Sequence, residues 1–313
     1  MNLKDEITYS IVAPIFNEIE SIPELYKRVS AVMDKMGDSW ELILVDDGCT
    51  DGSTQAILDL SENDDRVIPL IFARNFGHQI AVTAGWDHAR GDAVVIIDAD
   101  LQDPPEVIPE LAAKWKEGYE VVYAVRAERE GESWFKKFSA SVFYRLIARI
   151  TEVNIPLDTG DFRLLDRKVV DVLKSMHERH RFPRGMAAWV GFRQIGVEYN
   201  RAERFAGHTK YPFRKMLKLA MNAITSYSYF PLQISSYIGF FSAGLSIIAI
   251  PVVIILRMTG NQEFSGQATT LISVLFLGGV QLISLGILGE YIGRLYDEAK
   301  GRPLYILREI QKK

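Results

Sequence analysis

A short acidic stretch is the part of this sequence best equipped for chemistry. Asp98 and Asp100 stand one residue apart, Gln102 follows them, and a continuous apolar run at residues 93–97 precedes them. Carboxylate and amide oxygens are hard ligands that suit Mg²⁺ or Mn²⁺, and such an ion usually bridges to substrate phosphates. The sequence therefore predicts a site for Mg²⁺ or Mn²⁺ formed by Asp98, Asp100 and Gln102.

The position of this stretch favours a ligand site. The apolar run before it is typical of a buried strand, and Asp103 with two prolines after it is typical of a capped helix start. Ligands of open α/β sheets bind where core strands end. If the strand continues, Asp98 and Asp100 point the same way, because side chains alternate along a strand. The alternative is a solvated acidic turn.

Alternating strands and helices must hold these residues in place. Apolar runs predict strands at residues 9–15, 41–45, 67–72, 93–97 and 120–125, and helical periodicity predicts helices at 22–36, from 53 onward, at 78–89 and at 107–116. This alternation implies an α/β fold with a mostly parallel, doubly wound sheet. No G-x-G-x-x-G follows the first strand, which argues against a dinucleotide-binding dehydrogenase.

Polar residues also follow the first three predicted strands. They are Asn17 and Glu18 after the first strand, residues 46–52 after the second and residues 74–77 after the third. Any one of these segments could be an ordinary turn. Together with the acidic stretch they make four polar segments at one edge of the predicted sheet, and this arrangement predicts a nucleotide pocket. We expect Asp46 to contact the base or ribose and the metal site to hold the diphosphate.

The composition divides the chain into a soluble part and an apolar part. The 313 residues are 48% hydrophobic, and the formal net charge of −4 argues against a general nucleic-acid binder. The single cysteine, Cys49, rules out an intramolecular disulfide and suits a reducing compartment. Residues 234–256 and 268–288 contain no charged residue. Each run has the length of about 20 residues that a membrane-spanning helix needs.

Basic residues flank the two apolar runs. Four lie within residues 210–218 and six within 294–313, whereas the loop 257–267 holds one Arg and one Glu. The positive-inside rule then predicts a hairpin in the plasma (inner) membrane, with both termini cytoplasmic. Two buried core helices are the alternative. We expect a cytosolic domain at 1–210, an amphipathic juxtamembrane helix at 211–232, two transmembrane helices at about 234–256 and 268–289 within 233–294, and a basic cytosolic tail at 295–313.

Two further stretches suit a membrane surface. Residues 134–147 are basic, aromatic and amphipathic, and residues 211–230 lead into the first span. Such helices can lie in the membrane interface, although ordinary packing helices are the alternative. Small residues in the spans permit close helix packing, so we also expect a homo-oligomer; they are Gly239, Ala243, Gly278 and Gly279.

With these motifs the sequence resembles the family 2 glycosyltransferases. The residues that carry the resemblance are 12–18 (VAPIFNE), 45–48 (VDDG), 74–77 (RNFG) and 98–102 (DADLQ). Within that family the chain is most similar to polyprenyl-phosphate glycosyltransferases, which include dolichol-phosphate mannose synthases and bactoprenol glucosyltransferases of the GtrB type. The resemblance continues through residues 160–164, 184–191, 203–211 and 288–294, so it covers nearly the whole chain.

The resemblance implies a GT-A fold, a nucleotide-sugar donor, a divalent cation and inversion at the anomeric carbon. The donor-binding residues that it implies are Pro14, Asn17, Glu18, Asp46, Arg74, Asp98, Asp100, Gln102, Arg204 and Thr209. The loop that contains Thr209 would close over the donor. The chain departs from the family pattern at Cys49 and Thr209, where members often have serine.

The chemistry of sugar transfer suggests roles for other charged residues. A divalent ion stabilises the leaving diphosphate, and Lys210 or Arg204 could add a positive contact. A hydroxyl acceptor needs a base, which Asp161 could supply. A lipid phosphate needs a cationic clamp instead, because it is already an anion. The candidates for that clamp are Arg126, Arg129 and Arg163, and Asp161 could equally orient Arg163 or the sugar hydroxyls.

These features predict an inverting enzyme that moves a sugar, first of all glucose from UDP-glucose, onto polyprenyl (undecaprenyl) phosphate at the cytosolic membrane face. GDP-mannose or a UDP-amino sugar is the alternative donor. A processive polysaccharide synthase is disfavoured, because Trp189 lies outside a Q-x-x-R-W signature and two helices cannot enclose a channel. The intact acidic stretch and arginines disfavour a non-catalytic, membrane-anchored nucleotide sensor.

Overall fold

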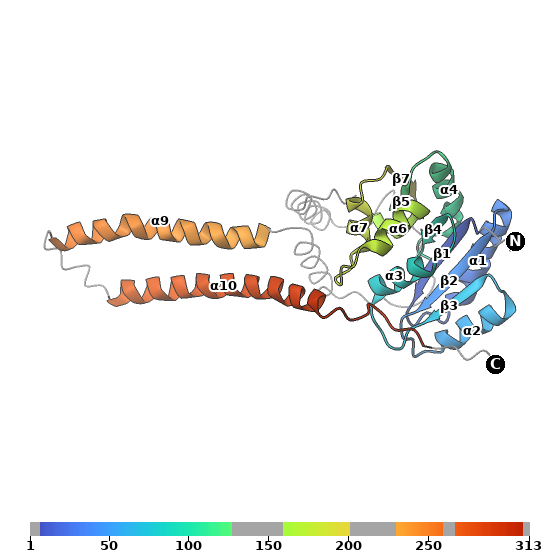
Figure 1. Ribbon diagram of the computed structural model, residues 1–313, viewed down its shortest axis with the longest axis horizontal. Helices are drawn as coiled ribbons and strands as arrows, with labels where there is room; N and C mark the ends of the chain where they lie inside the picture. Colours follow the sequence, from blue (N-terminus) through green and yellow to red (C-terminus); the bar gives the residue numbers. More distant parts are fainter. Residues whose placement is uncertain (1–6, 127–158, 201–229, 259–266, 309–313) are drawn as a thin grey trace. The chain divides into compact units, whose positions relative to one another are not determined.

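The computed structural model of the protein describes residues 7–126, 159–200, 230–258 and 267–308 (Figure 1). The chain forms two compact units. The first contains residues 1–149, 153–219 and 302–313, and the second contains residues 150–152 and 220–301. The chain thus leaves the first unit before the apolar hairpin and rejoins it afterwards.

A seven-stranded mixed sheet forms the centre of the first unit. Its strands are β1 (Tyr9–Ile15), β2 (Trp40–Asp46), β3 (Val67–Ile71), β4 (Ala93–Ile96), β5 (Val121–Arg126), β6 (Thr159–Asp166) and β7 (Gln194–Tyr199). The strand order is β3-β2-β1-β4-β6-β5-β7. Strands β1 to β4 pair in parallel, as the alternating pattern predicts, and β7 pairs in parallel with β5. Strand β6 runs antiparallel to both β4 and β5, so the sheet is mixed.

Helices cover both faces of this sheet. They are α1 (Ile22–Met36), α2 (Ser53–Asn63), α3 (His78–His88), the short 3₁₀ helix η1 (Pro105–Val107), α4 (Ile108–Lys116), α6 (Arg167–Ser175) and α7 (Pro183–Trp189). One core cluster joins the sheet to α1, α2 and α4, and a second joins the opposite face to α3, α6 and α7. Strand β1 is therefore buried on both faces, which explains its mostly apolar sequence.

The close packing of α3 on β1 fixes the position of the helix start. A Cβ atom added at Gly85 would lie 2.0 Å from Cγ1 of Val12, so only glycine allows this approach. Because α3 begins at His78, this contact holds His78 beside the end of the neighbouring strands.

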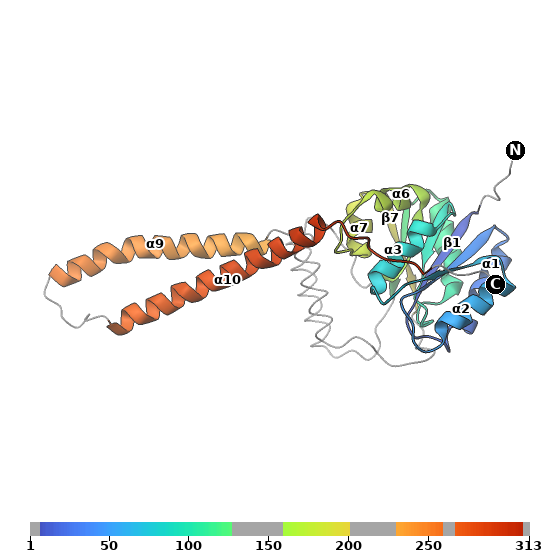
Figure 2. The same cartoon turned by 60° about the horizontal axis from the view of Figure 1, so that its bottom comes forward.

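The second unit contains two long helices, α9 (Phe230–Met258) and α10 (Gln267–Ala299). They lie side by side and antiparallel in both views of the chain (Figures 1 and 2). Large apolar side chains on both helices face outward; Phe240 and Leu282, for example, are 78% and 72% exposed. Among the described residues, one segment, Phe276–Ala299, is long and apolar enough to cross a membrane. The expected interfacial stretches 134–147 and 211–230 lie outside the described residues, apart from Phe230.

Two local expectations around the acidic stretch are wrong. Strand β4 ends at Ile96, so Asp98 and Asp100 do not continue the strand, and the argument from side-chain alternation does not apply to them. Asp103 does not cap the following helix. The η1 helix begins at Pro105, and Asp103 is fully buried, where it accepts a hydrogen bond from the Tyr199 hydroxyl.

Candidate active site

The acidic stretch forms a tight turn at the end of β4. The backbone N–H of Gln102 donates to Oδ1 of Asp100 over 3.1 Å. Leu101 has φ of 58°, a left-handed conformation that is uncommon for a residue with a side chain. Asp100 is buried, while the side chains of Asp98 and Gln102 are only partly buried. A strained residue held at a polar turn is typical of a functional site.

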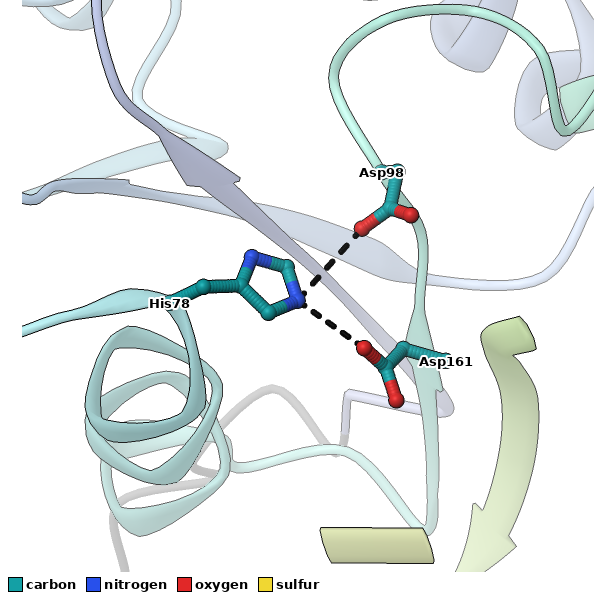
Figure 3. A group of neighbouring side chains, drawn as sticks. All are labelled: His78, Asp98 and Asp161. Carbon is teal, nitrogen blue, oxygen red and sulfur yellow. Dashed lines mark hydrogen bonds and ion pairs between the residues drawn. The ribbon is translucent and has the colours of Figure 1, made fainter. Parts of the chain in front are cut away.

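Asp98 lies in a cluster with two residues that are distant in the sequence (Figure 3). His78 comes from the first position of α3 and Asp161 from β6. Nε2 of His78 lies 3.0 Å from Oδ2 of Asp161 and 3.6 Å from Oδ1 of Asp98. The imidazole therefore stands between two carboxylates, as Figure 3 shows.

Arg184, from α7, completes the surroundings of Asp161. Its Nε donates to Oδ1 of Asp161 over 2.7 Å, so each carboxylate oxygen of Asp161 has a partner on a different helix. Burial alone would raise the pKa of Asp161, but Arg184 and His78 outweigh it and hold this pKa well below its usual range. Asp161 is therefore a carboxylate at neutral pH and a weak base.

The same cluster shifts the titration of His78 and Asp98. Burial opposes protonation of His78, but Asp161 and Asp98 raise its pKa to about 9. Burial raises the pKa of Asp98 to about 6, against the effect of His78. Oδ1 of Asp98 is buried and accepts no hydrogen bond from the described residues. A buried carboxylate oxygen in this state fits a divalent cation, which would keep the carboxylate ionised.

Two sets of side chains near this point could hold such a cation. The first is the predicted set of Asp98, Asp100 and Gln102. The second is His78, Asp98 and Asp161, whose ligand atoms lie within 4.8 Å of one another. Asp98 belongs to both sets. Because a protonated imidazole cannot ligate a metal, the second set requires His78 to lose its proton.

The loop after β2 folds around Asp46. Oδ1 of Asp46 accepts from the backbone N–H of Cys49 over 2.7 Å, and Oδ2 accepts from the Thr54 hydroxyl. Asn17, after β1, joins the same loop, because its Oδ1 accepts from the N–H of Thr50 over 2.8 Å. The predicted nucleoside residues after β1 and β2 thus lie together.

Asp47, which sequence reasoning did not single out, ties this loop to the loop after β3. Its Oδ1 accepts from the backbone N–H groups of Phe76 and Gly77 over 2.7 and 3.0 Å. Gly48 allows the two loops to touch: it has φ of 72°, and an added Cβ would lie 2.4 Å from the backbone nitrogen of Asn75. The two loops are therefore packed directly against each other at the edge of the sheet.

The remaining predicted donor residues lie along this edge. Pro14 is buried within β1, and the N–H of Glu18 donates to Ser53 Oγ over 3.2 Å. Arg74 is exposed, and its guanidinium carbon lies 4.1 Å from the centre of the Phe76 ring. Arg204 and Thr209 lie outside the described residues.

Arg126 and Arg163 occupy different environments. A Cβ at Gly160 would lie 3.1 Å from Nη2 of Arg126 and 3.6 Å from Oδ2 of Asp103, so the glycine leaves room for the guanidinium. Nε of Arg126 is buried and has no hydrogen-bond partner among the described residues. Arg163 is buried within β6, and its Nη2 donates to the carbonyl of Gly160 over 2.9 Å. Burial lowers the pKa of Arg163 to about 10. The third arginine candidate, Arg129, and Lys210 lie outside the described residues.

Sequence reasoning also missed His78 and Arg184. His78 directly follows the 74–77 motif at a helix start, and Arg184 lies in a stretch that carries the family resemblance. These positions could have marked both residues as candidates, but neither residue is near Asp161 in the sequence. Their contacts with Asp161 join residues 83 and 23 positions apart, which no local pattern reports.

Comparison with known proteins agrees with this fold. The family description "Glycosyl transferase family 2" matches residues 10–173, just over half of the chain, and "GtrB C-terminal hairpin" matches residues 230–295. The chain belongs to glycosyl transferase family 2, and the expected GT-A fold is confirmed.

Several relatives match over nearly their whole length. The chain is 51% identical to glycosyltransferase YkcC of Bacillus subtilis, over 97% of this chain and 94% of the relative. It is 44% identical to a bactoprenol glucosyl transferase of Shigella phage SfV, over 97% of this chain and 99% of the relative. A prophage bactoprenol glucosyl transferase homolog of Escherichia coli K12 is also 44% identical, over the same shares of both chains. The predicted enzyme class, a glycosyltransferase, is thus confirmed.

Proposed function

We propose that this enzyme transfers a sugar from a nucleotide donor to a polyprenyl phosphate, with glucose from UDP-glucose as the first choice. The observation that carries the proposal is the combination, in one chain, of a family 2 domain and a GtrB-type hairpin. The identity of 44% with a bactoprenol glucosyl transferase spans both parts. GDP-mannose or a UDP-amino sugar is the alternative donor.

The chemistry at Asp161 supports a phosphate acceptor. A sugar hydroxyl needs a base to remove its proton, whereas a phosphate is already a nucleophilic anion at neutral pH. Both oxygens of Asp161 are occupied by Arg184 and His78, and these partners hold its pKa low. Asp161 is therefore better suited to orient Arg184 and the substrates than to act as a base.

In the proposed reaction, a phosphate oxygen of the lipid attacks the anomeric carbon of the sugar. The bond between that carbon and the β-phosphate oxygen breaks, and the nucleoside diphosphate leaves with the electron pair. A bound divalent cation would neutralise the charge that develops on the leaving diphosphate. We assign the cation to Asp98, Asp100 and Gln102.

Arg126 is the best described candidate to hold the acceptor phosphate. Its buried Nε lacks a partner among the described residues, and a guanidinium fork suits a phosphate. Arg163 already donates to the carbonyls of Asp161 and Gly160, so we assign it to shaping β6. Lys210 and Arg204 remain proposed positive contacts to the donor, Thr209 a proposed part of its closing loop, and Arg129 a possible second clamp.

We further propose that α9 and α10 anchor the enzyme in the plasma membrane as a hairpin with both ends in the cytoplasm. Apolar side chains cover the outside of both helices. Residues 153–219 and 302–313, which precede and follow the second unit in the sequence, belong to the same compact unit, which supports placing both ends on one side of the membrane. We also expect a homo-oligomer, because the Cβ positions of Gly239, Gly278 and Gly279 face open space.

A panel of nucleotide sugars tests this proposal. The purified full-length protein is mixed with a short polyprenyl phosphate, Mn²⁺ and one donor at a time, and lipid products are identified by mass spectrometry. We expect a hexosyl phospholipid from UDP-glucose. A lipid product from another donor would change the proposed sugar and leave the proposed reaction in place. The absence of lipid product from every donor would contradict the proposal.

A further inference from the structure

The chain beyond α10 returns to the edge of the central sheet. We call residues 302–308 the C-terminal strap; they belong to the same compact unit as the sheet. The N–H of Ala73 donates to the carbonyl of Ile306 over 2.9 Å, and the N–H of Arg308 donates to the carbonyl of Ile71 over 2.8 Å. The strap thus extends the sheet beside β3, which is an edge strand.

Tyr305 fixes the strap through its side chain. Its hydroxyl donates to Oδ2 of Asp87, on α3, over 3.1 Å. Its ring stacks on Phe72, with centroids 5.4 Å apart and an interplanar angle of 17°. Phe72 in turn meets Phe76 edge to face, with centroids 5.5 Å apart. A continuous row of three aromatic rings therefore runs from the strap into the loop after β3.

That loop is part of the donor side of the site. Phe76 and Gly77 donate their N–H groups to Asp47, and Arg74 lies over the Phe76 ring. The next residue, His78, contacts both Asp161 and Asp98. A displacement of residues 72–77 would therefore move donor-binding groups and the start of α3 together.

We propose that the C-terminal strap is a positioning element of the donor site. It holds the loop 72–77 against the loop after β2, and Tyr305 acts on that loop through Phe72 and Phe76. The role in donor binding rests on the function proposed above. The segment that follows the apolar hairpin then helps to position the donor site and is more than a C-terminal tail.

Two matched pairs of variants test this role in the full-length protein. Arg308→Pro removes the N–H that bonds to Ile71, whereas Arg308→Ala keeps that N–H. Tyr305→Ala removes the ring from the stack, whereas Tyr305→Phe keeps the ring and loses only the hydroxyl. Hydrogen exchange of the amides of residues 72–77 measures how firmly the loop is held. Calorimetric titration with UDP and Mn²⁺ measures donor-site affinity, and the KM for polyprenyl phosphate measures the acceptor side.

We expect Arg308→Pro and Tyr305→Ala to accelerate exchange at Phe76 and Gly77. They should also weaken UDP binding about threefold to tenfold, the scale of one aromatic pair or one backbone hydrogen bond, with little change in acceptor KM. Arg308→Ala and Tyr305→Phe should stay within about twofold of wild type, because the first keeps the backbone N–H and the second keeps the ring. The contacts that they lose are peripheral to this test: the 3.4 Å bond from Arg308 Nη2 to the Ala73 carbonyl, which Arg308→Pro loses as well, and the Tyr305 hydroxyl bond to Asp87.

Unchanged exchange and unchanged UDP affinity in Arg308→Pro and Tyr305→Ala would overturn the positioning role. So would an equal rise in donor and acceptor KM, because that result indicates general loss of structure. A wild-type protein that binds neither UDP nor GDP would contradict the proposed function, and with it the role in donor binding. The exchange measurement would still decide whether the strap holds the loop.

Discussion

Nε of Arg184 donates to Oδ1 of Asp161 over 2.7 Å, and this bond joins helix α7 to strand β6, between β4 and β5 in the sheet. We expect Arg184→Gln to lower kcat on the order of a hundredfold, the effect typical of a catalytic group displaced by about 1 Å. The kcat of Arg184→Lys should fall between those of the wild type and Arg184→Gln, because lysine keeps the charge but lacks the planar fork. Steady-state kinetics with donor and acceptor varied separately checks this, and Lys168→Gln, an exposed change on α6, is the control. A wild-type kcat in Arg184→Gln would rule out the role.

The imidazole of His78 decides between the two possible metal sets. With its pKa raised to about 9, His78 is cationic at neutral pH and neutralises Asp98 and Asp161. His78→Ala removes that cation, so Mn²⁺ should bind about threefold to tenfold more tightly. Mn²⁺ titration followed by thermal unfolding measures this, with the exposed His177→Ala as control. Mn²⁺ binding that weakens tenfold or more would instead make His78 a metal ligand.

Gly48 and Gly37 form a matched pair for the contact between the loops after β2 and β3. Both have positive φ, 72° and 77°, but an added Cβ meets the Asn75 backbone at Gly48 and nothing within 4 Å at Gly37. Gly37→Ala should lose about 1 kcal/mol of unfolding free energy from backbone strain, and Gly48→Ala should lose more, because its Cβ also overlaps the Asn75 backbone. Only Gly48→Ala should also raise the donor KM, by about tenfold or more, because the loops must separate. Equal donor KM values in the two variants would show that this contact does not shape the site.

Cys49 reports on the loop around Asp46. Burial and the neighbouring Asp46 raise the pKa of its thiol to about 12. Because the thiolate is the reactive form, labelling at pH 8 should be on the order of a thousandfold slower than for a free cysteine. The rate with a thiol-specific reagent, read by intact mass, checks this, and labelling in denaturant is the control. Labelling of the folded protein at the free-cysteine rate would mean that the loop is open.

Local sequence patterns were sufficient for the first half of the sheet. Strand β1 and helix α1 have the bounds that the pattern predicts, because an apolar run and an amphipathic period of 3.6 are both local signals. Strand β6 was not predicted, because it buries Asp161 and Arg163 in its middle and so lacks an apolar run. Its antiparallel direction also breaks the simple strand–helix alternation.

The candidate site divides in the same way. The polar strand ends predict a site at the carboxyl edge of the parallel strands, since these strands place their carboxyl ends together, and this stays a prediction. The partners of Asp161 could not be read from spacing, because His78 and Arg184 reach it only through packing of α3 and α7. The hydrogen bond between Asp103 and Tyr199 could not be predicted for the same reason, since β6 and β5 lie between β4 and β7 in the sheet.

Metal-dependent transfer in the wild type and in Asp100→Ala tests the central claim most directly. Product formation from UDP-glucose and polyprenyl phosphate is measured with Mn²⁺, with Mg²⁺ and with EDTA, and thermal unfolding confirms that the variant is folded. We predict that the wild type forms lipid-linked hexose only with a divalent ion, and that folded Asp100→Ala loses this activity under all three conditions. Full activity of Asp100→Ala, or transfer by the wild type in EDTA, would contradict the account.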